Sequence, residues 1–254
     1  MTDLSRKLVV TADGESVTGF NHARLTGMDS IGLQPLPFTL RLWNLSDSDY
    51  YLLSSAKMIS VKHDDSVLAA GEISDICRGT VPEGTVTEIV FSAGLRLWEA
   101  PVSLSVEEGA SVSETVRRIL EASGTGIPLL SFLGEDPTRS RGQSFFGRAA
   151  ECVETALSAA KARCCLTPSG LCVIPASGVP VSMELTEEDI IDAPSRTGER
   201  LLVVRTTVTG WPLGKRVHVS WKGESAEGLV VMRSVDADNL EGNWQAELII
   251  DLKL

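Results

Sequence analysis

The sequence has no run of basic residues, and its charge balance is acidic. Its 254 residues include 23 Lys and Arg against 34 Asp and Glu, so the formal net charge is −11. A protein that binds nucleic acid of any sequence needs a positive surface, and an anionic membrane would repel this chain. The composition therefore disfavours stable binding to DNA, RNA or a membrane. It leaves open an acidic channel through which DNA passes without being held.

Long apolar segments are also missing. The longest apolar runs, such as Leu201–Val204, are far shorter than the ~20 residues that a spanning helix needs. The first residues, Met1–Lys7, lack the apolar core of a signal peptide. We therefore expect no secretion signal and no insertion of this chain into a membrane.

The residue patterns of common enzyme sites are absent. The histidines are His22, His63 and His218, and none has a metal-ligand partner at helical spacing. There is no phosphate-binding loop and no GxGxxG motif. Gly142–Gly147 has its second glycine one position too late for a nucleophile elbow. We expect no enzymatic activity and no cofactor, with a hydrolase or carbohydrate-binding β protein, its site assembled in space, as the alternative.

Cysteine is scarce and odd in number, and no two cysteines form a CxxC pair. Cys152 falls in a helical pattern and Cys172 in an apolar strand, so core packing explains them better than zinc does. We expect reduced thiols and no metal site. The five cysteines are Cys77, Cys152, Cys164, Cys165 and Cys172.

The chain does contain enough apolar residues to form a hydrophobic core. A folded chain of this mass buries roughly 70% of its unfolded surface. The pattern predicts an α+β protein, mainly β, with two related small β-barrels flanking a small α/β unit. The predicted units are residues 1–98, 99–180 and 181–254.

Residues 1–98 show the two-residue period of strands. Phe38, Leu40 and Leu42 alternate with other side chains, as in a half-buried strand. A short helix is expected from Asp49 to Ser54, capped by Asp47 or Ser48. The strands predicted here are Leu8–Val10, Phe38–Trp43, Ile59–Val61, Val67–Gly71 and Thr85–Ser92.

Residues 99–180 change to a mixed pattern. Ser111 and Glu114 form a capping box, and Gly124 ends the helix that follows. A second helix is predicted from about Ser144 to Arg163, with Ser144 as its cap and Phe146 on its buried face. Two strands, Cys164–Thr167 and Leu171–Pro175, come next.

Residues 181–254 return to β structure after a short helix predicted at Glu187–Ile191. The predicted strands are Leu201–Val208, Val217–Trp221, Gly228–Ser234 and Asn243–Leu252.

One internal likeness organises the chain: Ile59–Ser92 resembles Val217–Asp251. Each segment starts with alternating apolar residues and continues through a glycine, a Glu-Gly turn and a strand with an internal Glu. Meanders share turn chemistry, so this is either generic likeness or a pair of related barrels, and we favour the second. The matched residues are Gly71 and Gly228, Glu83–Gly84 and Glu241–Gly242, and Glu88 and Glu247.

The order of these segments resembles the tail or baseplate hub proteins of bacteriophages. This superfamily includes Mu-like tail proteins, late-control protein D and the hub of type VI secretion spikes. The chain is shorter than many Mu-like hubs, and no spike segment follows Leu254, so we expect a minimal hub that receives a separate tip. The segments that carry the resemblance are Phe38–Ser46, Leu104–Val112, Gly142–Ser144, Leu166–Leu171 and Leu185–Ile191.

The resemblance implies a homotrimer in the virion tail or baseplate, assembled in the cytoplasm of the bacterial host. Three chains with two related barrels each would form a ring of six similar barrels. Such a ring would adapt a sixfold tail tube to a threefold tip or spike protein, with DNA passing through its lumen. The implied partners are therefore the chain itself, a tail tube protein and a tip or spike protein.

Interfaces are expected at edge strands, because unpaired strands accept strands from neighbours. We expect Phe38–Trp43 and Asn243–Leu252 to lie at such edges. Tryptophan is enriched at interface hot spots, although each could instead pack in its own core. The candidate interface residues are Trp43, Trp98, Trp211, Trp221, Trp244, Phe38 and His218.

Overall fold

One large, mostly antiparallel sheet connects the two ends of the chain. The computed structural model describes residues 6–175, 179–207, 210–240 and 242–254, so the predicted positions Val208 and Glu241 lie outside it. The large sheet has 13 strands, in the order β14-β15-β18-β17-β3-β4-β7-β6-β5-β1-β2, with β16 on β17 and β13 on β16. Two smaller sheets lie in the middle of the chain. The protein is α+β and mainly β, as predicted.

The first β unit begins with a hairpin that closes at Asp13 and Gly14, both with positive φ. Its helix starts earlier than predicted, because Ser46 caps it by accepting a hydrogen bond from the Asp49 amide at 3.2 Å. The elements are β1 (Leu8–Ala12), β2 (Glu15–Val17), β3 (His22–Ser30), β4 (Pro37–Trp43), α1 (Asp47–Ser55), β5 (Met58–His63), β6 (Ser66–Val81) and β7 (Gly84–Ser92).

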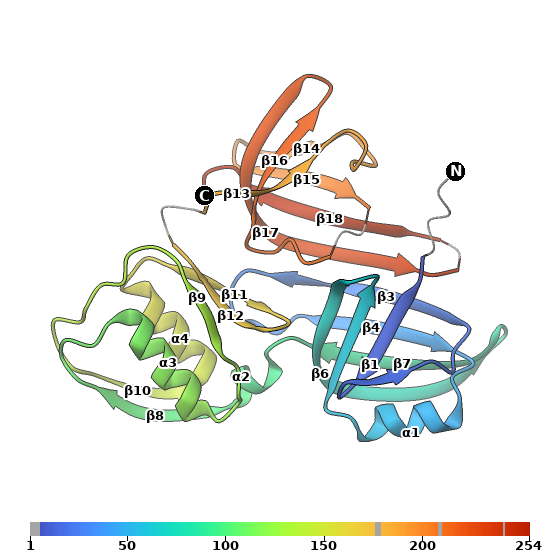
Figure 1. The fold of residues 1–254 in the computed structure, drawn as a ribbon, viewed down its shortest axis with the longest axis horizontal. Coiled ribbons are helices and arrows are strands. Elements are labelled where there is room, and N and C mark those ends of the chain that lie inside the picture. The colour runs from blue at the N-terminus through green and yellow to red at the C-terminus, as the bar shows by residue number, and fades with distance from the viewer. Residues whose placement is uncertain (1–5, 176–178, 208–209, 241) are drawn as a thin grey trace.

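The middle α/β unit packs two main helices against its two small sheets (Figure 1). Helix α3 begins as predicted, with the Ser111 hydroxyl accepting from the Glu114 amide, and ends at Gly124, where φ is +64°. The elements are α2 (Leu95–Glu99), β8 (Pro101–Val106), α3 (Val112–Ser123), β9 (Leu129–Phe132), β10 (Gln143–Arg148), α4 (Ala149–Ser158), β11 (Arg163–Thr167) and β12 (Gly170–Ile174).

The helix predicted from Ser144 to Arg163 is wrong in its first part. Residues 143–148 form strand β10 against β8, and α4 starts only at Ala149. Ser144 is not a cap, since its hydroxyl bonds to the Ser105 hydroxyl across the strands at 2.9 Å. Phe146 is 88% exposed, because side chains alternate across a strand and Phe145 takes the buried side.

The last β unit has no helix at Glu187–Ile191, contrary to the prediction. The Asp189 carboxylate accepts hydrogen bonds from the amide and hydroxyl of Thr186, a local bond that favours a turn over a helix. The elements are β13 (Val181–Leu185), β14 (Ser195–Thr197), β15 (Leu201–Thr206), β16 (Arg216–Trp221), β17 (Glu224–Asp238) and β18 (Trp244–Asp251).

The predicted repeat is confirmed by strand pairing. Gly71 of β6 lies opposite Ile59 of β5, and Gly228 of β17 lies opposite Val217 of β16. In each unit a bulge follows the glycine by two or three residues. The likeness extends to a fourth strand, because β4 pairs with β7 as β15 pairs with β18. We call β4–β7 without α1 the first frame and β15–β18 the last frame.

The two frames bend at the same place for the same reason. A methyl group on Gly71 would lie 2.4 Å from the Ser92 carbonyl, and one on Gly228 would lie 2.6 Å from the Asp251 carbonyl oxygen. Only a glycine lets the long strand pass so close to the end of its neighbour. Both β6 and β17 therefore pair with one strand before the glycine and with another after it.

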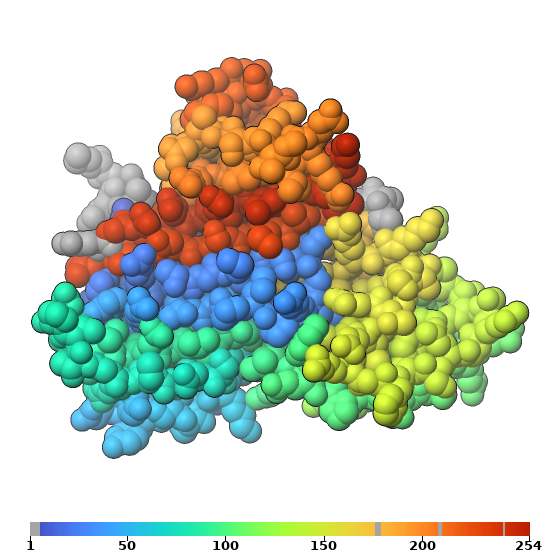
Figure 2. All heavy atoms as spheres, turned by 180° about the vertical axis from the view of Figure 1, so that it is seen from behind, coloured from blue at the N-terminus to red at the C-terminus, as the bar shows by residue number. Residues whose placement is uncertain are grey.

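The two β units also meet directly, through β3 and β17. Val235 and Ala237 of β17 belong to the hydrophobic core of the first unit, whereas Val230 belongs to the core of the last. Figure 2 shows the atoms of the last unit lying against those of the first, with the middle unit to one side. Within the described residues no helix is long and apolar enough to cross a membrane.

Candidate assembly surfaces

The junction of the two β units is a continuous antiparallel ladder. It runs from Met232 opposite Ser30 to Asp238 opposite Arg24. Strand β3 was not predicted, although Ala23 and Leu25 alternate with polar residues in the sequence and are fully buried in the structure. The junction shows how a frame can accept an additional strand, here β3 on β17, through backbone hydrogen bonds.

A buried ion pair lies in this junction. Arg233 is 1% exposed, and its Nη2 lies 2.9 Å from Oδ2 of Asp29. The same guanidinium donates to the carbonyls of Leu68 and Gly210, and the ring of Trp211 lies 4.7 Å from it. Burial raises the pKa of Asp29, and the charge of Arg233 opposes that rise. The pair is satisfied on every side, as a buried charge requires.

Polar pairs continue along the same ladder toward the surface. Arg24 binds both carboxylate oxygens of Asp236 at 3.0 Å. His22 lies 2.9 Å from Asp238 and stacks on Trp43 with ring centroids 4.0 Å apart. The junction thus joins the units by charge as well as by backbone pairing.

All five candidate tryptophans are half-buried. Three of them make ring contacts within the chain: Trp43 contacts His22, Trp211 contacts Arg233, and Trp244 contacts His63. Trp98 packs beside the core of the middle unit under Arg148, and Trp221 lies under Lys222 at the end of β16.

The other two candidates differ from each other. Phe38 is 0% exposed and packs against Phe91, 5.6 Å between centroids, so it presents no surface to a second molecule. His218 is half-exposed on β16, with Nδ1 3.3 Å from a Glu227 oxygen.

The expected edge strands are not edges. Phe38–Trp43 lies in β4, between β3 and β7, and Asn243–Leu252 contains β18, between β15 and β17. Which strand ends a sheet depends on pairing between distant segments, which the local pattern does not report. Among the described strands, β14 and β2 end the main sheet and β13 pairs with one neighbour only.

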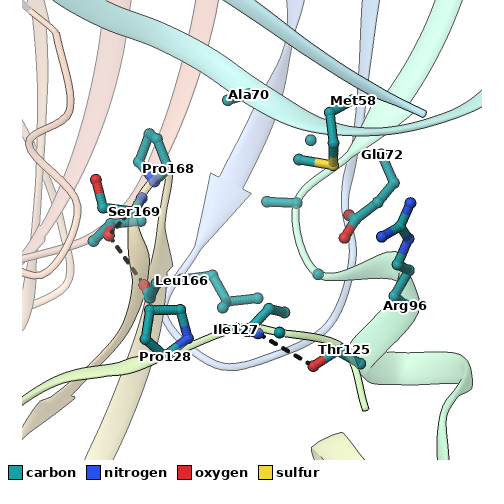
Figure 3. A pocket seen from close by; sticks show the side chains of 16 residues that line it. Met58, Ala70, Glu72, Arg96, Thr125, Ile127, Pro128, Leu166, Pro168 and Ser169 are labelled. Atoms are coloured by element: carbon teal, nitrogen blue, oxygen red, sulfur yellow. Dashed lines mark hydrogen bonds between the residues drawn. The ribbon is translucent and has the colours of Figure 1, made fainter. Parts of the chain in front are cut away.

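A cleft of about 290 Å³ separates the first β unit from the middle unit. Glu72 and Arg96 line one wall, and Thr125–Pro128 and Leu166–Gly170 line the other (Figure 3). The Glu72 carboxylate accepts from the Leu95 amide at 3.2 Å and so caps α2. The lining includes no histidine, cysteine or second carboxylate, so this cleft offers no acid–base pair.

Metal and thiol chemistry has no built site in the described part of the chain. No group of three or more His, Cys, Asp and Glu side chains converges there. All five cysteines are free, and only Cys77 is exposed. Burial raises the pKa of Cys165 to about 12, which keeps that thiol protonated and unreactive at neutral pH.

No protein-family model matches the chain, and no curated protein matches it in sequence. Solved structures do share its fold. A tail protein from Neisseria meningitidis superposes with a TM-score of 0.68 at 12% identity, over 96% of this chain and 95% of that one. The 43 kDa tail protein of prophage MuSo2 from Shewanella oneidensis gives 0.65 at 9% identity, over 97% of both chains.

A third solved structure is a type VI secretion system component from E. coli, described as similar to bacteriophage T4 tail proteins. It superposes with a TM-score of 0.65 at 12% identity, over 95% of this chain and 76% of that one. Over nearly its whole length, the chain has the fold of these phage tail and type VI secretion proteins.

Proposed function

We propose that the protein is a structural hub in the tail or baseplate of a phage or phage-like injection machine. The observation that carries the proposal is the internal repeat: one chain holds two frames with the same strand order, glycine bend and bulge, joined through strand β3. The shared fold with tail and type VI secretion proteins supports it.

The working form in this proposal is a homotrimeric ring. Two similar frames in each chain give six in the ring, which matches a sixfold tail tube, while the true threefold symmetry matches a trimeric tip or spike. Closed cyclic symmetry is usual among oligomers. The function is geometric, so no bond is made or broken and the protein is not an enzyme.

The partners are a second and third copy of the chain, a tail tube protein, a separate tip or spike protein, and DNA in transit. Each chain carries a net charge of −11. Acidic side chains along a lumen would repel DNA phosphates and keep the DNA mobile. Purified protein should therefore give no band shift with duplex DNA, and stable retention of DNA at physiological salt would contradict the channel.

Trp98, Trp221 and His218 stay candidates for interface contacts, because their exposed parts lie away from the β3–β17 junction. Substituting each of these residues by Ala should cost more free energy of trimer association than free energy of unfolding of the single chain. The unit boundaries near residues 98 and 180 stay predictions. The cleavage positions found by limited proteolysis test them.

Light scattering on the purified protein, followed by negative-stain imaging of the same peak, tests the ring. We expect a mass near three times 27.2 kDa and a central hole with a pseudo-sixfold outline. A trimer without a hole would support the predicted oligomeric state but contradict the tube-adaptor role. A monomer at every concentration reached would contradict the hub itself.

A further inference from the structure

Strands β6 and β14 each leave an edge of the main sheet open within the described chain, as β2 and β13 do. Strand β6 pairs with β5 only up to Glu72, and from Ile73 to Val81 it pairs with β7 alone. Strand β14 pairs only with β15, and its three residues are all exposed. Open edges with free amides and carbonyls are the usual site of strand addition.

The last frame shows what can cover the first of these edges. The residues of β17 after its bulge occupy the place of Asp75–Val81 in β6. The equivalence follows from the register: Ser234 lies opposite Glu247 in β18, as Cys77 lies opposite Glu88 in β7. In the last frame this stretch is covered, because β17 pairs there with β3.

The register also identifies the counterpart of β3. Arg41 lies opposite Glu88 and Arg205 lies opposite Glu247, so Phe38 corresponds to Leu202. Phe38 pairs with Gly27 of β3, and Leu202 pairs with Arg196 of β14. Strand β14 therefore holds the same position in the last frame as β3 holds in the first, and Thr197 takes the place of Met28.

We propose that β14 of a second copy of this chain pairs antiparallel with the β6 edge between Asp75 and Val81. The contact repeats between chains the ladder that joins β3 and β17 within one chain. Ser234 lies opposite Met28 in that ladder, so the repeated register sets Cys77 of one copy opposite Thr197 of the next.

This contact suits a ring because its two sides differ. Each chain offers one β6 edge and one β14 edge, so the contact is head to tail and leaves an unused edge on each partner. Three such contacts close when the rotation between neighbours is one third of a turn. The inference thus rests on the proposed ring and specifies which strands hold it together.

The surroundings of the β6 edge are compatible with an added strand. Arg78 is already bonded to the Asp47 carboxylate at 2.7 Å and to the Leu45 carbonyl at 2.6 Å. The register brings it opposite Arg196, an unfavourable pair that Asp47 partly neutralises. In the last frame, Gly210 and Trp211 likewise contact Arg233 of β17 while β3 pairs along the same strand.

A cysteine cross-link tests the register. Residues directly opposed in an antiparallel pair have Cα atoms about 4.5–5.5 Å apart, within the range of about 4.4–6.8 Å that a disulfide spans. Cys77 is exposed and free. Mild oxidation of the Thr197→Cys variant should therefore give chains linked through position 77 of one and position 197 of the next, seen on non-reducing gels and assigned by peptide mass.

Two matched variants control the cross-link. Adding Cys77→Ser to Thr197→Cys removes one of the two thiols and should abolish the link. Arg196→Cys places its thiol on the neighbouring residue, which is equally exposed but faces the other side of the sheet, and should link poorly. Equal linking by Thr197→Cys and Arg196→Cys would overturn the proposed register.

Light scattering on the same sample separates this inference from the proposed function. A trimeric mass without the link between positions 77 and 197 would overturn the strand contact and leave the ring. A monomeric mass without the link would overturn both. The link in a trimer supports both.

Charge provides a second measurement that needs no oxidation. Cys77→Lys with Thr197→Lys sets two like charges across the contact and should weaken trimer association several-fold at low salt. Cys77→Lys with Thr197→Glu should restore it. Equal association of the two double variants would overturn the contact.

Discussion

The first and last frames share a backbone plan but differ where a neighbouring strand covers them. Both have the glycine bend, the bulge and a cross-strand Arg–Glu pair. At one inward position they diverge: Ile76 lies opposite Ile89 in the first frame, and Arg233 lies opposite Leu248 in the last. Ile76 is half-buried at an open edge, whereas Arg233 is buried in the junction.

This difference shows that the repeat preserves strand geometry and leaves side chains free to adapt to each neighbour. A buried guanidinium is costly unless it is paired and hydrogen-bonded. Arg233 donates to a carboxylate from β3 and to a carbonyl from β6, so it bonds the last unit to two strands of the first. The open edge of the first frame has no such residue.

The largest effect is expected from breaking the Arg233–Asp29 pair. Asp29→Ala leaves a buried cation without its carboxylate, which should lower the free energy of unfolding by about 3–5 kcal/mol. Urea denaturation followed by tryptophan fluorescence measures the loss, and Trp211 beside Arg233 reports locally. The exposed carboxylate of Asp75 in the first frame provides the control, with Asp75→Ala expected to change stability by less than about 0.5 kcal/mol. Equal losses for the two variants would contradict the distinction between the frames.

The glycine bends should respond alike in the two frames. Gly71→Ala and Gly228→Ala each force a methyl group against a backbone carbonyl, so each should lose about 1–3 kcal/mol. Gly79→Ala, where no atom lies within 4 Å of the added methyl, should be neutral or slightly stabilising. Chemical denaturation of the three variants tests this, and a bend that tolerates Ala in one frame alone would show that the frames are not equivalent.

Acid should act more strongly on the last frame than on the first. Asp251 ends β18 where Ser92 ends β7, and hydrogen bonds from Arg200 lower the pKa of Asp251. A folded pKa below the unfolded value, about 3.9, stabilises the protein above that pH. The contribution is lost as the pH falls through the folded pKa. Asp251→Asn should therefore destabilise the chain at pH 6 and lose that effect near pH 2.

Ser92→Ala is the matched control for this pH dependence. It removes a polar side chain at the corresponding strand end without changing any charge, so its effect on unfolding should not vary between pH 6 and pH 2. If Asp251→Asn lowers the free energy of unfolding by the same amount at both pH values, the proposed role of ionised Asp251 is refuted.

Local chemistry predicted much of the fold. The capping box at Ser111, the glycine at the end of α3 and the strand β4 follow from spacing within a few residues. The repeat was visible because Gly71 and Gly228 keep their places relative to the strands around them. Such features depend on neighbours along the chain.

The assembly surfaces were harder to predict, because they depend on segments far apart. Asp29 and Arg233 are separated by 204 positions, and neither has a local signal that names the other. Strand β4 pairs with β3 as well as β7, and β18 pairs with β15 as well as β17, so both are inner strands and the expected edges were wrong. Phe146 was misplaced because its segment fits a helical pattern as well as a strand, and only the partner β8 decides between them.

The smallest effect is expected from the surface ion pairs that the frames share. Arg41 and Glu88 lie 2.7 Å apart, and Arg205 and Glu247 lie 3.1 Å apart, all partly exposed. A double-mutant cycle should give the first pair a coupling below about 1 kcal/mol. The second should couple less, because Arg205 is shared with Asp192 at 3.4 Å. Asp192→Asn should bring the second coupling up to the first, and 1 M salt should abolish both. If Asp192→Asn leaves the second coupling unchanged, the difference arises within the frames themselves and their equivalence ends at the backbone.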